Sequence, residues 1–126
     1  DSSEKVHICY YTGYLKYATN ASGSWTSAVI EEADIEENTA IAVDSSDIVH
    51  IVYHQSPESS EDKLRYMNNL FGLWAITTLE CDSSDVGVAP SIAIDTNGKI
   101  HIIYYNNNYA QYRGYLQYAT NKSGCW

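Results

Sequence analysis

Residues 95–126 read DTNGKIHIIYYNNNYAQYRGYLQYATNKSGCW, and this stretch contains the pattern on which the fold depends. It begins with Asp and a short polar turn, continues with an apolar segment that carries His and then Tyr, and ends with Leu-x-Tyr, a second turn and Trp. The same order recurs in two earlier segments, Asp1–Trp25 and Asp44–Trp74. A self-similar unit every roughly 45–50 residues is typical of propellers and related repeat arrays.

Each unit predicts short antiparallel strands rather than helices. In the middle unit the four expected strands are Thr39–Asp44, Ile48–His54, Leu64–Met67 and Trp74–Leu79. The first of them alternates Ile and Val with Ala, and small residues on one side suit an innermost strand whose neighbours crowd against it. Polar turns such as Thr96-Asn97-Gly98 read as hairpin connections. No segment shows a convincing helical period.

Four antiparallel strands per unit at this period predict an all-β fold, a β-propeller with four-stranded blades. We expect a single repeat domain over residues 1–126, with blade repeats at about 1–38, 39–88 and 89–126. This is about two and a half to three blades, fewer than the typical four to eight of a closed ring. The ring is therefore expected to be completed by oligomerisation, with a dimer as the preferred assembly, or by sequence missing from this chain.

Charge and composition limit the partners of the chain. The formal net charge is −9, and Arg65 and Arg113 are the two arginines of the sequence. Nucleic-acid binding relies on clustered Lys and Arg, so a nucleic-acid partner is not expected. No apolar run approaches the roughly 20 residues that span a bilayer, and a membrane partner is not expected either. The sequence indicates no cofactor.

Two copies of one hairpin carry a family resemblance. They read ATNASGSW (residues 18–25) and ATNKSGCW (residues 119–126). They resemble the Asp-box of sialidase-like propellers, Ser-x-Asp-x-Gly-x-x-Trp, which lies at the same hairpin of the blade. The box is degenerate here, because Asn20 and Asn121 replace its Asp and the Gly lies one place closer to the Trp.

A second pattern resembles another group of propellers. Residues 95–104 read Asp-x-Asn-Gly-Lys-x-His-x-x-Tyr, which is similar to repeats of uncharacterised secreted bacterial propellers. The resemblance implies an extracellular or cell-surface location.

The resemblance to sialidases does not extend to their chemistry. A sialidase-like enzyme needs three arginines that clamp the substrate carboxylate, together with a Tyr nucleophile assisted by Glu. This chain has two arginines, neither at a position that the family pattern assigns to the clamp. We therefore assign no catalytic residue, and a fragment of a sialidase-like glycoside hydrolase is kept as the alternative.

Recurring titratable residues are expected to be structural. His7, His50 and His101 share one repeat position, which separates them by whole blades, and three such imidazoles cannot converge on one metal ion. Each is expected to bond its own blade's Asp or a backbone group, and no metal site is predicted. The acidic run Glu31–Asn38 reads as a solvated loop rather than a calcium site. Cys9 is expected to be a small core residue. Cys81 and Cys125 could form a disulfide with each other or remain free thiols.

The loops at one end of the predicted blades differ in every copy, as a binding face on a rigid scaffold does. The loop Asn106–Gly114 gathers amide, phenol and guanidinium groups, which suit either sugars or a protein partner. The predicted ligand-binding residues are Asn106, Asn107, Tyr109, Tyr112 and Arg113. The sequence thus predicts a non-enzymatic binding or scaffold module, with glycans as candidate ligands of these loops. A self-assembling repeat element without a small ligand is a further alternative.

Overall fold

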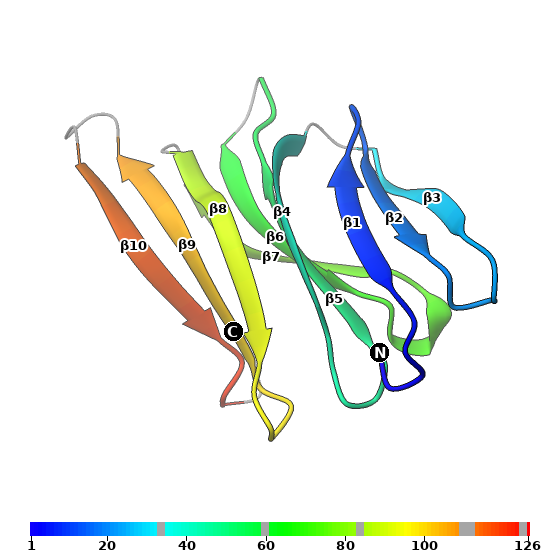
Figure 1. Cartoon of the computed structure of the whole chain (residues 1–126). Coiled ribbons are helices and arrows are strands. Elements are labelled where there is room, and N and C mark those ends of the chain that lie inside the picture. Colours follow the sequence, from blue (N-terminus) through cyan, green and yellow to red (C-terminus); the bar gives the residue numbers. More distant parts are fainter. Residues whose placement is uncertain (33–34, 59–60, 83–84, 109–112, 124–125) are drawn as a thin grey trace.

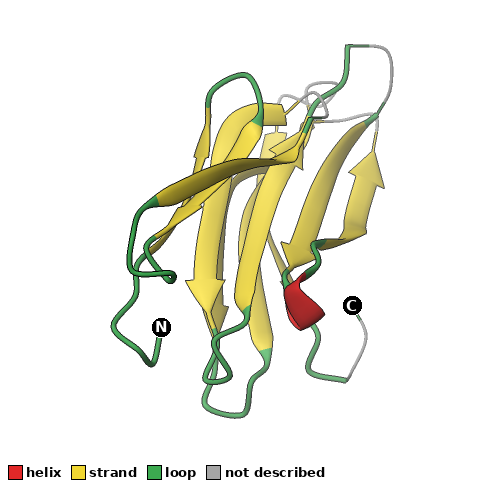
Figure 2. Ribbon diagram, turned by 90° about the vertical axis from the view of Figure 1, so that its right-hand side faces the viewer, coloured by secondary structure: helices red, strands yellow, loops and turns green. Residues whose placement is uncertain are grey.

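A computed structural model gives the fold of the chain and describes residues 1–32, 35–58, 61–82, 85–108, 113–123 and 126. Within these residues the secondary structure consists of ten strands and one short 3-10 turn (Figures 1 and 2). The elements are β1 (His7–Tyr11), β2 (Leu15–Thr19), β3 (Thr26–Glu31), β4 (Ile35–Val43), β5 (Val49–Gln55), β6 (Asp62–Asn68), η1 (Leu70–Gly72), β7 (Ala75–Asp82), β8 (Asp85–Ile94), β9 (Ile100–Asn108) and β10 (Arg113–Thr120).

The described strands form three antiparallel sheets that follow one another along the chain. The first sheet contains β1, β2 and β3, the second contains β4 to β7, and the third contains β8, β9 and β10. Within each sheet, strands that are consecutive in sequence are hydrogen-bonded neighbours. Figure 1 shows the sheets side by side in chain order. The all-β, antiparallel prediction is confirmed.

Apolar side chains fill the space between neighbouring sheets. One cluster joins the first sheet to the second, and its buried members are Leu15, Ile35, Val49, Ile51, Tyr53 and Met67. The other joins the second sheet to the third, and its buried members are Val52, Leu64, Tyr66, Val86, Ile100, Ile102 and Tyr104. Because alternate residues of β5 enter different clusters, the second sheet is apolar on both faces and packs on both of its neighbours.

The strands at the variable end are longer than the sequence indicated. The prediction of a solvated loop over Glu31–Asn38 is wrong for most of its length, because β4 begins at Ile35, which pairs with Gln55 across the sheet. In the same way β7 continues to Asp82 and β8 begins at Asp85. Continued pairing satisfies backbone N–H and C=O groups that would otherwise need water, so polar residues enter the strands.

The predicted ligand loop is shortened for the same reason. β9 continues through Asn108 and β10 starts at Arg113, with Asn107 opposite Gly114 in the register. Asn106 and Asn107 are therefore strand residues, and Arg113 opens a strand. Tyr109 and Tyr112 lie outside the described residues.

Two smaller expectations concern cysteine and the membrane. Cys9 is half-buried beside the first cluster, where its Sγ lies 3.2 Å from Thr39 Oγ1, in keeping with the predicted core role. Cys125 and the side chain of Cys81 lie outside the described part of the chain. Among the described residues, no helix has the length and apolar character needed to cross a membrane.

Candidate functional site

One polar network is repeated in every sheet. It joins the Asp that opens the repeat to the His of the next strand and to the Tyr of the following strand, and the three copies are Asp1–His7–Tyr17, Asp44–His50–Tyr66 and Asp95–His101–Tyr118. In the second copy Nε2 of His50 lies 3.3 Å from Asp44 Oδ2, and Nδ1 lies 2.6 Å from the hydroxyl of Tyr66. Of the two partners expected for each His, a backbone group or its own Asp, the structure shows the Asp in all three copies.

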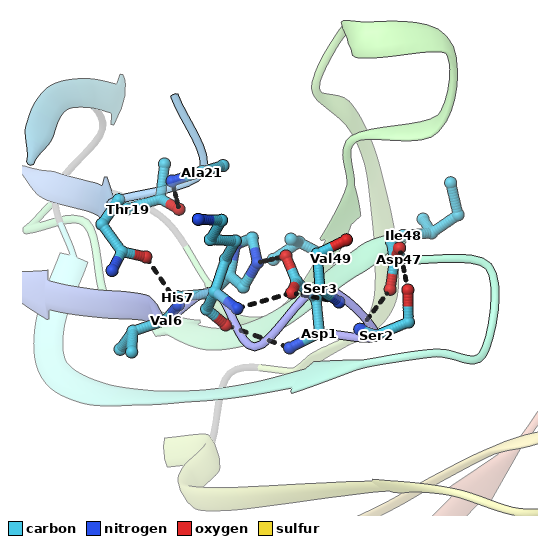
Figure 3. A network of polar contacts seen from close by, with 12 residues as sticks. Asp1, Ser2, Ser3, Val6, His7, Thr19, Ala21, Asp47, Ile48 and Val49 are labelled. Carbon is cyan, nitrogen blue, oxygen red and sulfur yellow. Dashed lines mark hydrogen bonds and ion pairs between the residues drawn. The ribbon is translucent and has the colours of Figure 1, made fainter. Parts of the chain in front are cut away.

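The geometry assigns the protons in these networks. A carboxylate accepts hydrogen bonds, so Nε2 of a neutral imidazole must carry the proton that it donates to Asp, and Nδ1 is left to accept from the Tyr hydroxyl. The other carboxylate oxygen accepts from the turn. Asp1 Oδ1 accepts from the backbone N–H groups of Ser3 and Lys5 at 3.0 and 2.7 Å (Figure 3). Each network therefore ties one hairpin turn to two adjacent strands.

Turns of neighbouring sheets also touch directly at this end of the molecule. Ser2 donates its backbone N–H to Asp47 Oδ1 at 2.8 Å and its hydroxyl to Asp47 Oδ2 at 2.6 Å (Figure 3). These bonds hold the pKa of the Asp47 carboxyl below its usual value. The networks and turns thus have a structural role. A ligand site is therefore expected at the opposite end of the sheets, where the variable loops lie.

Burial controls the ionisation of the central network. Burial lowers the pKa of His50, and the hydrogen bond and charge of Asp44 oppose this without cancelling it. Burial alone would raise the pKa of Asp44, but hydrogen bonds from the backbone N–H groups of Ile48 and Ser46 and from His50 outweigh it and lower that pKa. The folded state therefore favours a neutral imidazole beside an ionised carboxylate.

These shifts predict that acidification destabilises the fold. A His whose folded pKa is lowered contributes stability that is complete above its unfolded pKa, near 6.5, and is lost as the pH falls below it. Asp44 adds a loss in the same direction at lower pH. Urea unfolding should give a free energy that is level near about pH 8 and falls toward about pH 5. The variant His50→Gln should show a shallower fall, and an equally steep one would contradict this account.

A different polar group lies between the first and second sheets, toward the variable end, and we call it junction 1: Glu31, Tyr53, Gln55 and Arg65. The Tyr53 hydroxyl, fully buried, donates to Glu31 Oε2 at 3.3 Å across the two sheets. Burial, followed by the Glu31 charge, raises the pKa of Tyr53 despite the opposing effect of Arg65. The phenol therefore keeps its proton and acts as a donor.

The amide and the guanidinium of junction 1 have unused hydrogen-bonding capacity. Gln55 is two residues from Tyr53 on β5 and so projects from the same face, where it is 7% exposed. Arg65 is the cross-strand partner of Tyr53 and donates through Nη1 to Thr78 Oγ1 at 2.5 Å. Gln55 Oε1 and Arg65 Nε are buried with no hydrogen-bond partner among the described residues.

The second and third sheets repeat this arrangement as junction 2: Glu80, Tyr104, Asn106 and Gln117. The Tyr104 hydroxyl donates to Glu80 Oε2 and lies 3.4 Å from Gln117 Oε1. Burial, then the hydrogen bond to Glu80 and its charge, raises the pKa of Tyr104. Asn106 occupies the position of Gln55, is likewise 7% exposed, and its Oδ1 has no partner within the described chain.

The junctions share a set of groups suited to a polyhydroxylated ligand. Each combines a carboxylate from one sheet with a protonated phenol and an amide from the next. Buried polar atoms normally find partners, so an unpartnered amide oxygen at the same position in two sheets indicates a site open to a further hydrogen bond. Junction 1 differs in having a guanidinium, which adds a charge-assisted donor.

The predicted ligand-binding residues divide between described and undescribed parts of the chain. Asn106 belongs to junction 2, and Asn107 is the next residue of β9, half-buried and on the opposite face. Arg113 is placed by its backbone alone, and Tyr109 and Tyr112 fall outside the described residues. The structure thus brings Asn106 together with residues that the sequence did not predict to bind a ligand.

A signal for the junctions was nevertheless present in the sequence. Tyr53 and Tyr104 each stand three residues after the repeated His, and Glu31 and Glu80 each stand six residues after the repeated Trp. The recurrence of both positions marks them as part of the repeat. Their contact across neighbouring sheets is visible only in three dimensions.

Comparisons with known proteins bear on the fold. No protein-family model and no curated protein matches this sequence. Among solved structures, the chain is similar to a fucose lectin from Kordia zhangzhouensis, determined in complex with methyl-fucoside. The TM-score is 0.55 at 16% sequence identity, with 94% of this chain and 90% of that chain covered. At this identity the likeness concerns the fold, and the chain therefore has the β-rich fold of that lectin.

Proposed function

We propose that the chain is a non-enzymatic β-propeller module that binds glycans at the junctions between its sheets. The observation that carries the proposal is the duplicated set of carboxylate, phenol and buried, unpartnered amide oxygen at junctions 1 and 2. Sugar hydroxyls donate and accept at once, so neighbouring donors and acceptors of this kind suit them.

Several features support reading the sheets as propeller blades. Each sheet is an antiparallel meander that packs on the next, and the first strands of the second and third sheets, β4 and β8, contact each other. Gly87 on β8 approaches so closely that an added Cβ would lie 3.0 Å from Leu64 Cβ. Leu64 belongs to β6, the third strand of the second sheet, so this close approach supports tight stacking of one sheet on the next, as neighbouring blades require.

The choice of ligand class rests on chemistry and on the fold together. Glu31 and Arg65 at junction 1 are partly exposed and so accessible from solvent. The structural likeness to a fucose lectin makes a monosaccharide of that kind the first ligand to try. The Asp-box resemblance and an extracellular or cell-surface location are part of the same proposal, since extracellular glycans would be the natural ligands.

The proposal predicts a measurable effect of Arg65. We expect a glycan array followed by titration calorimetry, with methyl-fucoside as the first probe, to detect binding. Arg65→Ala should weaken it by roughly tenfold to a hundredfold, because a charge-assisted hydrogen bond is lost. Lys122→Ala, which removes an exposed cation at the opposite end, is the matched control and should bind like the unmodified chain.

Other variants separate the possible binding surfaces. Tyr109→Ala combined with Tyr112→Ala tests the loop predicted from sequence, whereas Asn106→Ala tests junction 2. Weakened binding by the loop variant alone would move the site from the junctions to the loop. An array without any signal would remove the glycan proposal, and hydrolysis of a fluorogenic glycoside would favour the sialidase-like alternative instead.

A further inference from the structure

The first sheet exposes an apolar face whose counterparts elsewhere are buried. In the second and third sheets, we call the face that packs on the preceding sheet the leading face. The leading face of the first sheet is the one that carries the same repeat positions. On the first sheet this face carries Val6, Ile8, Trp25 and Val29, between 42% and 57% exposed. In the second sheet the repeat positions of Val6 and Ile8 are Val49 and Ile51, both fully buried. In the third sheet they are Ile100 and Ile102, at 4% and 0%.

The third sheet shows the converse. Its trailing face, which points away from the second sheet, carries Ile103, Leu116 and Tyr118, exposed by 47%, 74% and 57%. The same positions in the second sheet are Val52, Leu64 and Tyr66, which are almost completely buried against the third sheet. Large apolar side chains gathered on one sheet face in this way mark an interaction surface.

The contacts between neighbouring sheets within the chain show what covers such faces. At each of them the trailing face of one sheet packs on the leading face of the next, with Leu15 in the cluster of Val49 and Ile51 and Leu64 in that of Ile100 and Ile102. The exposed trailing face of the third sheet is thus equivalent to the trailing faces of the first and second sheets, which are covered by the leading face of the next sheet.

An aromatic pair lies at each of the two contacts between neighbouring sheets. Tyr17 of the first sheet contacts Trp74, which follows the second sheet's third strand, with ring centroids 5.2 Å apart. Tyr66 of the second sheet contacts Trp126 with ring centroids 5.0 Å apart. Among the described residues, the repeat leaves Trp25 and Tyr118 without the inter-sheet partner that their counterparts have.

We infer that the leading face of the first sheet is an interface for the trailing face of the third sheet of a second copy of this chain. In this contact Trp25 of one copy packs on Tyr118 of the other, as Trp74 packs on Tyr17. The contact joins two different surfaces, so it is heterologous, and such contacts build closed rings or open filaments. Two copies supply six sheets, within the typical range of four to eight for a propeller, whereas three copies exceed it. The expected product is a two-fold symmetric dimer with two identical contacts.

The inference does not depend on sugar binding and is tested without a ligand. Sedimentation or light scattering should give twice the mass of one chain. Each copy carries a formal charge of −9, so the dimer should strengthen as added salt screens the repulsion. A chain that stays monomeric at every accessible concentration and salt level would overturn the inference.

Two charge variants identify the faces. Ile8→Glu places a charge on the leading face of the first sheet, and Leu116→Glu places one on the trailing face of the third sheet. Both side chains are exposed in the single chain, so circular dichroism should show an unchanged fold. Each variant alone should associate roughly a hundredfold more weakly, because a charge is buried in both contacts of the dimer. Leu73→Glu, at an exposed leucine outside both faces, should still dimerise.

Mixing the two variants gives the sharpest result. Ile8→Glu retains an intact trailing face and Leu116→Glu an intact leading face, so the mixture should form a one-to-one heterodimer through one unmodified contact. A dimer that survives Leu116→Glu, or a mixture that stays monomeric while the unmodified chain dimerises, would overturn the head-to-tail arrangement. Should a glutamate variant fail to fold, Ile8→Ser and Leu116→Ser provide the same comparison with a smaller perturbation.

Discussion

Replacing Leu64 with alanine is expected to lower the free energy of unfolding by about 3 kcal/mol, within the range of buried Leu→Ala substitutions. Leu64 is fully buried and lies between the second and third sheets, in the cluster of Val86 and Ile102. The surrounding side chains belong to paired strands and cannot collapse freely into the cavity, so both the lost burial and the remaining void contribute. Urea unfolding followed by circular dichroism measures the effect.

The control for this substitution is Leu73→Ala. Leu73 is 75% exposed, follows η1 and takes part in neither apolar cluster, so its loss should change the stability by no more than about 0.5 kcal/mol. Equal effects of the two substitutions would mean that the second and third sheets do not pack as described.

The second large effect is expected for Asp44→Ala, at about 2–3 kcal/mol. Asp44 Oδ1 accepts the backbone N–H groups of Ser46 at 2.8 Å and Ile48 at 2.9 Å, and Oδ2 accepts from His50. Alanine removes all three bonds and leaves the imidazole of His50, in a residue that is 7% exposed, without its acceptor. An unsatisfied buried donor costs more than the mean value of a hydrogen bond.

Repetition within the chain provides a matched control for this prediction. Asp95→Ala removes the equivalent bonds to Asn97, Lys99 and His101, but that Asp is exposed and water can replace the lost partner. Its effect should therefore be clearly smaller than that of Asp44→Ala. Equal losses would show that the turn bonds alone, and not the burial of His50, determine the contribution of the network.

The inferred dimer would increase the destabilisation caused by Asp95→Ala relative to that caused by Asp44→Ala. His101 and Tyr118 lie on the trailing face of the third sheet, so a second copy would bury the third network as the third sheet buries the second. The destabilisation caused by Asp95→Ala should then increase with chain concentration, because it would act on the dimer as well as on the folded chain.

Local features of the structure could be predicted from the sequence. The alternation of apolar residues, the Asp turns and the threefold recurrence of His and Tyr predict antiparallel strands at the observed positions, as β5 and β9 show. A structural role for each His within its own repeat could be predicted for the same reason, since His and Asp are six residues apart in one hairpin, but the choice of Asp over a backbone group was made by the structure. Such features depend on neighbours within a single repeat, where side-chain direction alternates regularly.

The tertiary structure decided the rest. Residues 35–38 of the acidic segment and residues 106–108 of the Asn-rich segment belong to strands, because backbone pairing across the sheet outweighed their polar composition. Glu31 and Tyr53 are 22 residues apart and Glu80 and Tyr104 are 24 apart, and each pair meets only because neighbouring sheets stack. A repeat pattern specifies the strands of one sheet, whereas the groups that face each other between sheets depend on how those sheets pack.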